Sequence, residues 1–223
     1  ENQKNTQLAE DPEIEEMIRA GVHLGHTRTK RNSHMDPYIL GVRNNVELID
    51  LAKTKELLSE ALDFIKDLAS KGKLILLVGT QPAAKKAIEE AGEETHLPRV
   101  ILRWVGGTLT NFKVISKRVE TLERLEQEKA SGELEKYTKK ERAKFEEEIS
   151  ALKKNFDGLR ILKNLPDVIF VVNPGHDDLV IKEANRMKIP VVALCDTNSD
   201  PYLISYPIPS NDDALPAVKY MVG

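Results

Sequence analysis

The chain has 223 residues, of which 40% are hydrophobic and 31% are charged, and its formal net charge is −3. This balance is typical of one large globular domain, with or without an appendage, and it excludes a polycation that binds nucleic acid over its whole surface. No apolar run approaches the ~20 residues of a membrane span, and the single cysteine, Cys195, excludes a disulfide within the chain and favours a reducing compartment.

The N-terminal part of the chain predicts one short helix. Residues 1–10 are polar and lack periodicity, which predicts a loose terminus. Asp11 and Pro12 then form a helix-start signal, since Asp favours the cap and Pro the first helical position. Apolar residues follow at helical spacing, and Gly21 can close the helix.

The segment 19–43 differs in charge from the rest of the chain. It contains one acid, Asp36, against five basic residues: Arg19, Arg28, Lys30, Arg31 and Arg43. The segment is also rich in Gly, Asn, Ser and Pro, so it predicts a basic loop that contacts phosphate groups. Its charge alone is equally compatible with an ordinary solvated loop.

Two histidines in this segment raise the question of a metal site. His23 and His26 are three residues apart, with His34 nearby. No cysteine or acid lies at ligand spacing around them, whereas zinc sites combine such residues in fixed patterns. We therefore expect these histidines to contact backbone or phosphate groups, and we predict no metal there.

Apolar runs and amphipathic stretches alternate along most of the chain. The expected strands are 46–49, 74–78, 98–105, 167–172, 189–194 and a short last one within 202–208; the expected helices are 51–71, 83–91, 180–187 and 214–221. Runs that are apolar throughout are typical of strands buried on both faces. The alternation therefore predicts an α/β fold with a doubly wound, mostly parallel sheet.

Polar residues follow several of these strands, where sheets of this type bind ligands. The turn 79–82 joins a strand to a helix, which is a phosphate-binding position in many α/β proteins. Four acids that suit a hard cation follow later strands: Asp177, Asp178, Asp196 and Asp200. The chain nevertheless lacks a glycine-rich phosphate motif and a nucleophile–base pair, and helix caps, such as Asp177, explain the acids. We predict no catalytic residue and no cofactor or metal site, with a nucleotide- or metal-dependent α/β enzyme as the alternative.

Residues 111–155 predict a helical hairpin. Apolar residues recur every three or four positions from Phe112 to Leu125 and again from Phe145 to Phe156. Ser131-Gly132 breaks the pattern, and Thr138 to Glu141 form a capping box. Because each seam is narrow and its surroundings are charged, we expect an antiparallel hairpin that projects from a single α/β domain made of residues 1–110 and 156–223.

The stretch 103–112 combines a strand end, a tight turn and a helix start. Gly106 and Gly107 permit positive φ, and Trp104 is expected to be a packing anchor. Three further residues can cap the helix or donate hydrogen bonds to RNA: Thr108, Thr110 and Asn111. Arg103 and Lys113 flank the turn and are candidates for phosphate contacts.

Short strings distributed over nearly the whole chain resemble those of one known family. They are AGVHLGH at 20–26, PYI at 37–39, RN at 43–44, IDL at 49–51, KT at 53–54, VGT at 78–80, RWVGGTLTNF at 103–112, LPD at 165–167, IPVVA at 189–193, DTN at 196–198, DP at 200–201, YPIP at 206–209 and NDDA at 211–214. In this order they resemble the small-subunit ribosomal protein S-two family of bacterial type. The chain departs from the family at Arg31 and Ser33, where members often carry Trp and Pro, and this affects the conformation expected for the basic loop.

The resemblance implies a fold and a function. The fold would be a flavodoxin-like sheet with a projecting coiled-coil hairpin. The protein would be a structural constituent of the small ribosomal subunit and not an enzyme, located in the cytoplasm, without membrane contact and not a homo-oligomer. Its partners would be small-subunit ribosomal RNA (rRNA) and neighbouring small-subunit proteins, including ribosomal protein S-one, which it helps to recruit for translation. The residues that we predict to bind rRNA are Arg28, Lys30, Arg31, Arg43, Arg103, Thr108, Thr110, Asn111 and Lys113.

Overall fold

The computed structural model describes residues 11–223, so the predicted loose terminus lies outside the described residues. The chain forms a five-stranded parallel sheet of order β5-β4-β6-β7-β8 and a three-stranded antiparallel sheet of order β1-β3-β2. Counted along the chain, the five parallel strands follow the order 2-1-3-4-5 of flavodoxin-like sheets. The predicted α/β class with a mainly parallel sheet is confirmed.

The strands and helices of the large sheet alternate along the chain, as expected. They are α3 (Leu51–Ser70), β4 (Ile75–Val78), α4 (Pro82–Thr95), β5 (Arg99–Val100), β6 (Val168–Val172), α7 (Asp178–Met187), β7 (Val191–Cys195), β8 (Tyr206–Pro209) and α8 (Leu215–Val222). Alternate strand residues enter two separate cores, because successive side chains point to opposite faces. Helices α3, α4 and α8 cover one face, and α7 with the base of the hairpin covers the other.

The basic segment is more ordered than the sequence predicts. Helix α2 (Pro12–Ala20) ends at Gly21, which has φ +80° as expected, and β1 (Leu24–Thr27), β2 (Ile39–Arg43) and β3 (Val46–Ile49) form the small sheet. The prediction of a loop is therefore wrong for most of the segment. Asn44 and Asn45 have φ of 50° and 64°, the combination that closes a tight hairpin between antiparallel strands.

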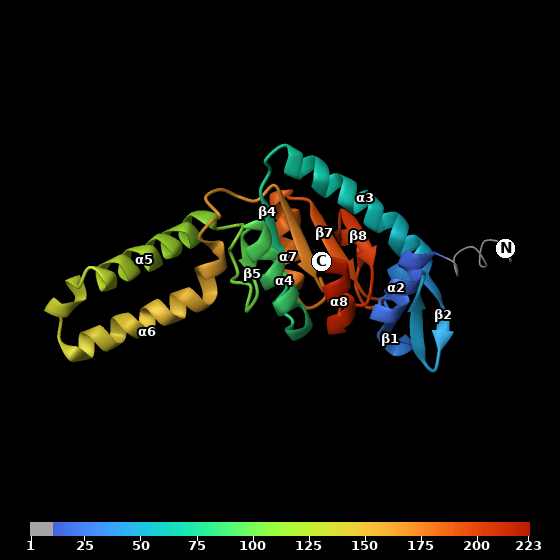
Figure 1. Cartoon of the computed structure of the whole chain (residues 1–223), viewed down its shortest axis with the longest axis horizontal. Helices are drawn as coiled ribbons and strands as arrows, with labels where there is room; N and C mark the ends of the chain where they lie inside the picture. Colours follow the sequence, from blue (N-terminus) through green and yellow to red (C-terminus); the bar gives the residue numbers. More distant parts are fainter. Residues whose placement is uncertain (1–10) are drawn as a thin grey trace.

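The hairpin consists of α5 (Phe112–Ala130) and α6 (Lys139–Phe156), which lie side by side and extend from one end of the molecule, opposite the small sheet (Figure 1). The predicted capping box is confirmed, since Thr138 and Glu141 exchange hydrogen bonds at the start of α6. The buried residues of the seam have the expected spacing: Ile115, Val119, Leu122, Leu125, Ile149, Leu152 and Phe156. These residues belong to the same apolar cluster as one face of the large sheet, so the core continues into the base of the hairpin.

Two expected strands are shorter than predicted. Only Arg99–Val100 pairs within the segment 98–105, because β5 is an edge strand and the chain leaves the sheet after Val100. At the other edge, β8 begins at Tyr206, since Asp200 and Pro201 start a 3-10 turn over Pro201–Leu203. Among residues 11–223, no helix is long and apolar enough to cross a membrane.

Candidate nucleic-acid interface

Three of the predicted phosphate-binding cations lie exposed on the N-terminal module, which consists of α2 and the small sheet (residues 12–49). Arg28 and Lys30 form a 3-10 turn after β1, and Arg43 ends β2. Within the described part of the chain, none of the three forms an ion pair with a carboxylate. Their charges are therefore available to an external anion.

Arg31 has an internal role in this structure. Its guanidinium pairs with Asp36, and its Nη1 lies 3.4 Å from Oε1 of Glu47, a carboxylate that is fully buried on β3. A buried carboxylate without a cation is costly, so Arg31 stabilises the module. Sequence reasoning predicted the strand 46–49 but not this pairing, although alternation along β3 places Glu47 on the same buried face as Ile49.

The turn 103–112 is organised around Glu183, a buried residue of α7. Its Oε1 accepts hydrogen bonds from the amide of Gly107 at 2.7 Å and from Nε1 of Trp104 at 3.2 Å. Its Oε2 accepts from the amides of Leu109 at 3.0 Å and Thr110 at 3.1 Å, and from the hydroxyl of Thr110 at 3.1 Å. Burial raises the pKa of this carboxyl, but the hydrogen bonds outweigh burial and hold the pKa below its usual value.

This arrangement changes the roles expected for the polar residues of the turn. Asn111 occupies the N-cap position of α5 but makes no side-chain capping bond, and Thr110 donates to Glu183 instead. Thr108 is buried, and its hydroxyl donates to the carbonyl of Val105 at 2.6 Å, so its side chain stabilises the turn. Gly107 has φ +92°, which confirms the expected need for glycine.

Sequence reasoning missed Glu183, although a signal was present. The residue lies on the apolar face of its helix, between Val180, Ile181 and Ala184, where a charged side chain is unusual unless it is paired. Arg103 and Lys113, which flank the turn, are exposed and form no ion pair among residues 11–223. The expected burial of Trp104 is confirmed.

The helix start that could hold a nucleotide phosphate is occupied by the chain itself. Asp177 accepts hydrogen bonds from the amide of Thr80 at 3.2 Å and from its hydroxyl at 2.7 Å, at the end of β4 and just before α4. Burial raises the pKa of Asp177. The prediction that Asp177 caps its own helix is wrong, because its carboxylate forms no capping bond there. A carboxylate bound to the residue just before the N-cap of α4 would repel a phosphate group there, which argues against the nucleotide-dependent alternative.

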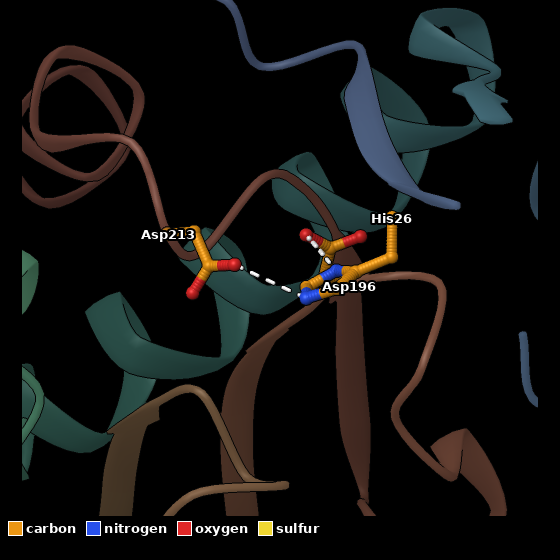
Figure 2. A group of neighbouring side chains, drawn as sticks. All are labelled: His26, Asp196 and Asp213. Atoms are coloured by element: carbon orange, nitrogen blue, oxygen red, sulfur yellow. Dashed lines mark ion pairs between the residues drawn. The ribbon is translucent and has the colours of Figure 1, made fainter. Parts of the chain in front are cut away.

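A histidine and two carboxylates meet where the small sheet contacts the large one (Figure 2). The Nδ1 of His26 lies 3.0 Å from Oδ2 of Asp196, and its Nε2 lies 3.1 Å from Oδ2 of Asp213. Asp196 follows β7 and is buried, and contact with it raises the pKa of His26. A protonated imidazole between these carboxylates would link β1 to the carboxyl edge of the large sheet. With a neutral imidazole, the same three residues could hold a metal ion, because their ligand atoms lie within 4.8 Å of one another.

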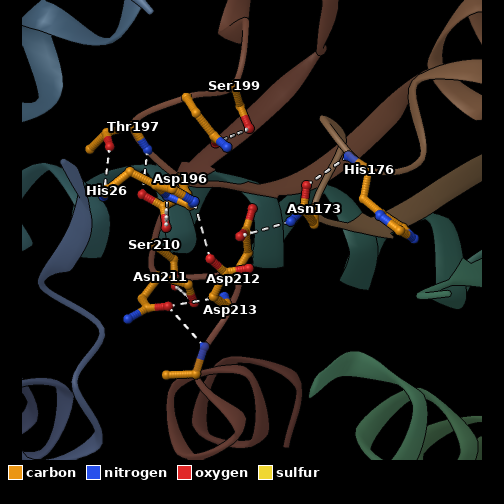
Figure 3. A network of polar contacts seen from close by, with 12 residues as sticks. His26, Asn173, His176, Asp196, Thr197, Ser199, Ser210, Asn211, Asp212 and Asp213 are labelled. Carbon is orange, nitrogen blue, oxygen red and sulfur yellow. Dashed lines mark hydrogen bonds and ion pairs between the residues drawn. The ribbon is translucent and has the colours of Figure 1, made fainter. Parts of the chain in front are cut away.

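Further polar contacts surround this group (Figure 3). Asp212 is fully buried; one of its oxygens accepts from Asn173 at 3.1 Å, and the other has no hydrogen-bond partner among the described residues. The amide of His26 donates to the hydroxyl of Thr197 at 3.0 Å. His23 takes no part in the group. The expectation that the His26 side chain contacts backbone or phosphate groups is wrong, because its ring nitrogens contact two carboxylates from distant segments.

Comparison with known proteins agrees with the family resemblance seen in the sequence. The family described as "Ribosomal protein S2", the S-two family named above, matches residues 17–223. The chain is 45% identical over 210 residues to the small ribosomal subunit protein uS2 of Thermus thermophilus, covering 94% of this chain and 82% of that protein. It is 43% identical to the uS2 of Dictyoglomus thermophilum and 44% identical to that of Fusobacterium nucleatum, covering 94% of this chain and 85% of each relative.

Proposed function

The chain belongs to the ribosomal protein S-two family, whose members are structural proteins of the small ribosomal subunit and not enzymes, and from this premise we propose that it binds small-subunit rRNA through two exposed basic surfaces. The first surface, the N-terminal basic surface, consists of Arg28, Lys30 and Arg43. The second, the turn surface, consists of Arg103 and Lys113 with Asn111, whereas the hydroxyl of Thr110 donates to Glu183. Arg31 and Thr108 support these surfaces from within rather than contact RNA.

The observation that carries the proposal is the availability of these cations in an acidic chain. The net charge is −3, so the chain as a whole does not attract RNA, and any attraction must come from local groups of basic residues. Arg28, Lys30 and Arg43 nevertheless have no carboxylate partner in the described residues, unlike Arg31. Unpaired surface arginine and lysine are the residues that neutralise phosphates and release counterions.

Reversing the N-terminal basic surface should weaken binding and its salt dependence. The salt slope is the change in the logarithm of the binding constant with the logarithm of the salt concentration. With Arg28, Lys30 and Arg43 changed to glutamate, we expect this slope for small-subunit rRNA to fall in magnitude by about 0.9 for each lost phosphate contact. Filter binding over a salt series measures this slope. Lys139→Glu with Lys140→Glu, at the far end of the hairpin, is the control and should change it less. A wild-type slope near zero would contradict RNA binding by the protein.

We further propose that α5 and α6 form a coiled coil and that residues 111–155 are an insertion in one α/β domain. The seam residues recur at three- and four-residue spacing on both helices, as coiled-coil packing requires. The apolar core of the sheet continues into the base of the hairpin. If residues 111–155 are an insertion, their removal should destabilise the α/β domain but should not prevent it from folding.

Removal of the hairpin tests that division. Replacing residues 113–155 by a short Gly/Ser loop should leave a domain that melts cooperatively, although at a lower temperature, because the deletion removes Ile115 and Leu152 from the apolar cluster that covers one face of the sheet. Circular dichroism during heating is the measurement. A broad, non-cooperative transition would show that the arms are part of the core. We expect the shortened protein to assemble poorly into small subunits.

The recruitment of ribosomal protein S-one and contacts with other small-subunit proteins are proposed on family membership alone. Depletion of this chain from reconstituted small subunits should lower the amount of S-one that they retain. Retention at the normal level would remove this part of the proposal and leave the RNA-binding part unaffected.

A further inference from the structure

A groove of about 430 Å³ lies between the base of the helical hairpin and the edge of the large sheet. Its walls come from α4, from β5 and the chain that follows it to Arg103, and from the C-terminal part of α6 with the 3-10 turn that follows it. None of the residues of the N-terminal basic surface lines it, and the small sheet lies at the opposite end of the molecule (Figure 1). It is therefore separate from the N-terminal basic surface, and it adjoins the turn surface, with which it shares Arg103.

The charged residues of the groove leave positive charge unpaired. Its six charged residues are Arg99, Arg103, Lys153, Lys154, Glu89 and Asp157. Asp157 forms an ion pair with Arg160, which does not line the groove; Nη2 of Arg160 lies 2.8 Å from Oδ1 of Asp157. Arg99 forms an ion pair with Glu93 at 2.9 Å. Lys153 lies 4.0 Å from a carboxylate oxygen of Glu126. Among residues 11–223, Arg103 and Lys154 have no carboxylate partner and Glu89 has no cationic partner, so the unpaired charges of the groove are two positive and one negative.

The backbone beside Arg103 adds unpaired donors. After Val100 the chain leaves the sheet, and the amides of Leu102 and Arg103 donate no hydrogen bond within the described residues. Both residues are exposed. Free amide groups beside arginine and lysine side chains are the combination that binds phosphate oxygens in nucleic-acid complexes.

The groove is also held in a fixed shape. Gly158 follows α6 and passes so close to β5 that a Cβ on it would lie 2.2 Å from the carbonyl oxygen of Arg99. This contact fixes the end of the hairpin against the sheet edge. Leu102 and Arg103 also line a second cavity of about 230 Å³ at the carboxyl ends of β4 and β6, so the two hollows adjoin at Arg103.

We propose that this groove binds a stretch of rRNA backbone, with phosphates against Arg103 and Lys154 and against the free amides of Leu102 and Arg103. The inference rests on the proposed RNA-binding function and assigns to it a site that includes Lys154 and the hairpin base. The groove carries no exposed aromatic side chain for base stacking among the described residues, so it contacts the backbone and positions the protein without reading sequence.

The test combines two charge reversals in the full-length protein. Arg103→Glu with Lys154→Glu should lower the magnitude of the salt slope for small-subunit rRNA by about 0.9 for each lost contact, and should lower affinity at least tenfold at low salt. Arg142→Glu with Lys144→Glu is the matched control, because these residues are exposed on the same hairpin helix and have no ion pair in the described residues. Thermal melting verifies folding, and Arg103→Ala with Lys154→Ala serves if the reversed variant does not fold.

The outcomes separate this inference from the proposed function. If the wild-type protein does not bind rRNA, both are overturned. If it binds and the groove variants bind with unchanged slope, the groove and the assignment of Arg103 to the turn surface are both overturned, while RNA binding by the N-terminal basic surface stands. If the variants bind rRNA normally but fail to enter subunits, the groove holds a neighbouring protein segment, and the RNA assignment is overturned.

Discussion

Replacing Glu183 by alanine is expected to lower the free energy of unfolding by roughly 3–5 kcal/mol, because each buried donor left without a partner costs about 1–3 kcal/mol. The substitution removes the acceptor of five hydrogen bonds in the turn that joins the sheet to the hairpin. Two of the donors, the indole of Trp104 and the amide of Leu109, are buried and cannot turn to water. Chemical denaturation monitored by circular dichroism measures the loss.

Two further variants show whether the carboxylate itself is responsible. Glu183→Gln keeps the size and one acceptor oxygen, so its loss should be intermediate. Lys182→Ala changes an exposed neighbour on the same helix and should have an effect within about 0.5 kcal/mol. A Glu183→Ala protein that unfolds like the Lys182→Ala protein would show that the turn is stable without this carboxylate.

The pH dependence provides an independent check. The pKa of Glu183 is lowered in the folded protein from its ordinary value of 4.5, so its ionised form stabilises the fold. A lowered pKa contributes stability that is present above the unfolded value and is lost as the pH falls through the folded value. The difference in stability between the wild type and Glu183→Gln should therefore be constant above about pH 5.5 and should shrink below pH 4.5.

Local sequence signals predicted much of the fold. Gly21 ends α2, and Thr138 and Glu141 form their capping box, because both features depend on residues that are close in sequence. The apolar runs became buried strands, and the hairpin seam has the expected spacing. The Asn44-Asn45 turn was overlooked because the basic, turn-rich composition of the segment favoured a loop.

The contacts that organise the candidate site are between distant residues. Glu183 reaches a turn more than 70 positions earlier, and Asp177 reaches Thr80 across 97 positions. His26 meets Asp196 and Asp213 only after two sheets are in place. Sequence patterns identified the polar residues at the strand ends and turns. Their hydrogen-bond and ion-pair partners depend on the order of the strands in the sheet, which a single sequence does not encode locally.

Replacing Gly158 by alanine is expected to lower the free energy of unfolding by about 3 kcal/mol or more, at the upper end of the range for over-packed sites. An added Cβ would lie 2.2 Å from the carbonyl oxygen of Arg99 and 3.1 Å from its carbonyl carbon. These are backbone atoms of the edge strand β5, so the neighbour cannot turn aside as a flexible side chain would. The chain can relieve the contact only by moving the hairpin base away from the sheet.

The chain offers a matched control in Gly41, which lies in β2 and where an added Cβ would meet no atom within 4 Å. Gly41→Ala should change stability by less than about 1 kcal/mol, since it adds a methyl group in open space. Thermal melting of both variants gives the comparison. Equal melting temperatures for Gly158→Ala and Gly41→Ala would mean that the hairpin base tolerates displacement. In that case the angle between hairpin and sheet would be set by the turn at Gly107 and Glu183, not by the contact of Gly158 with β5.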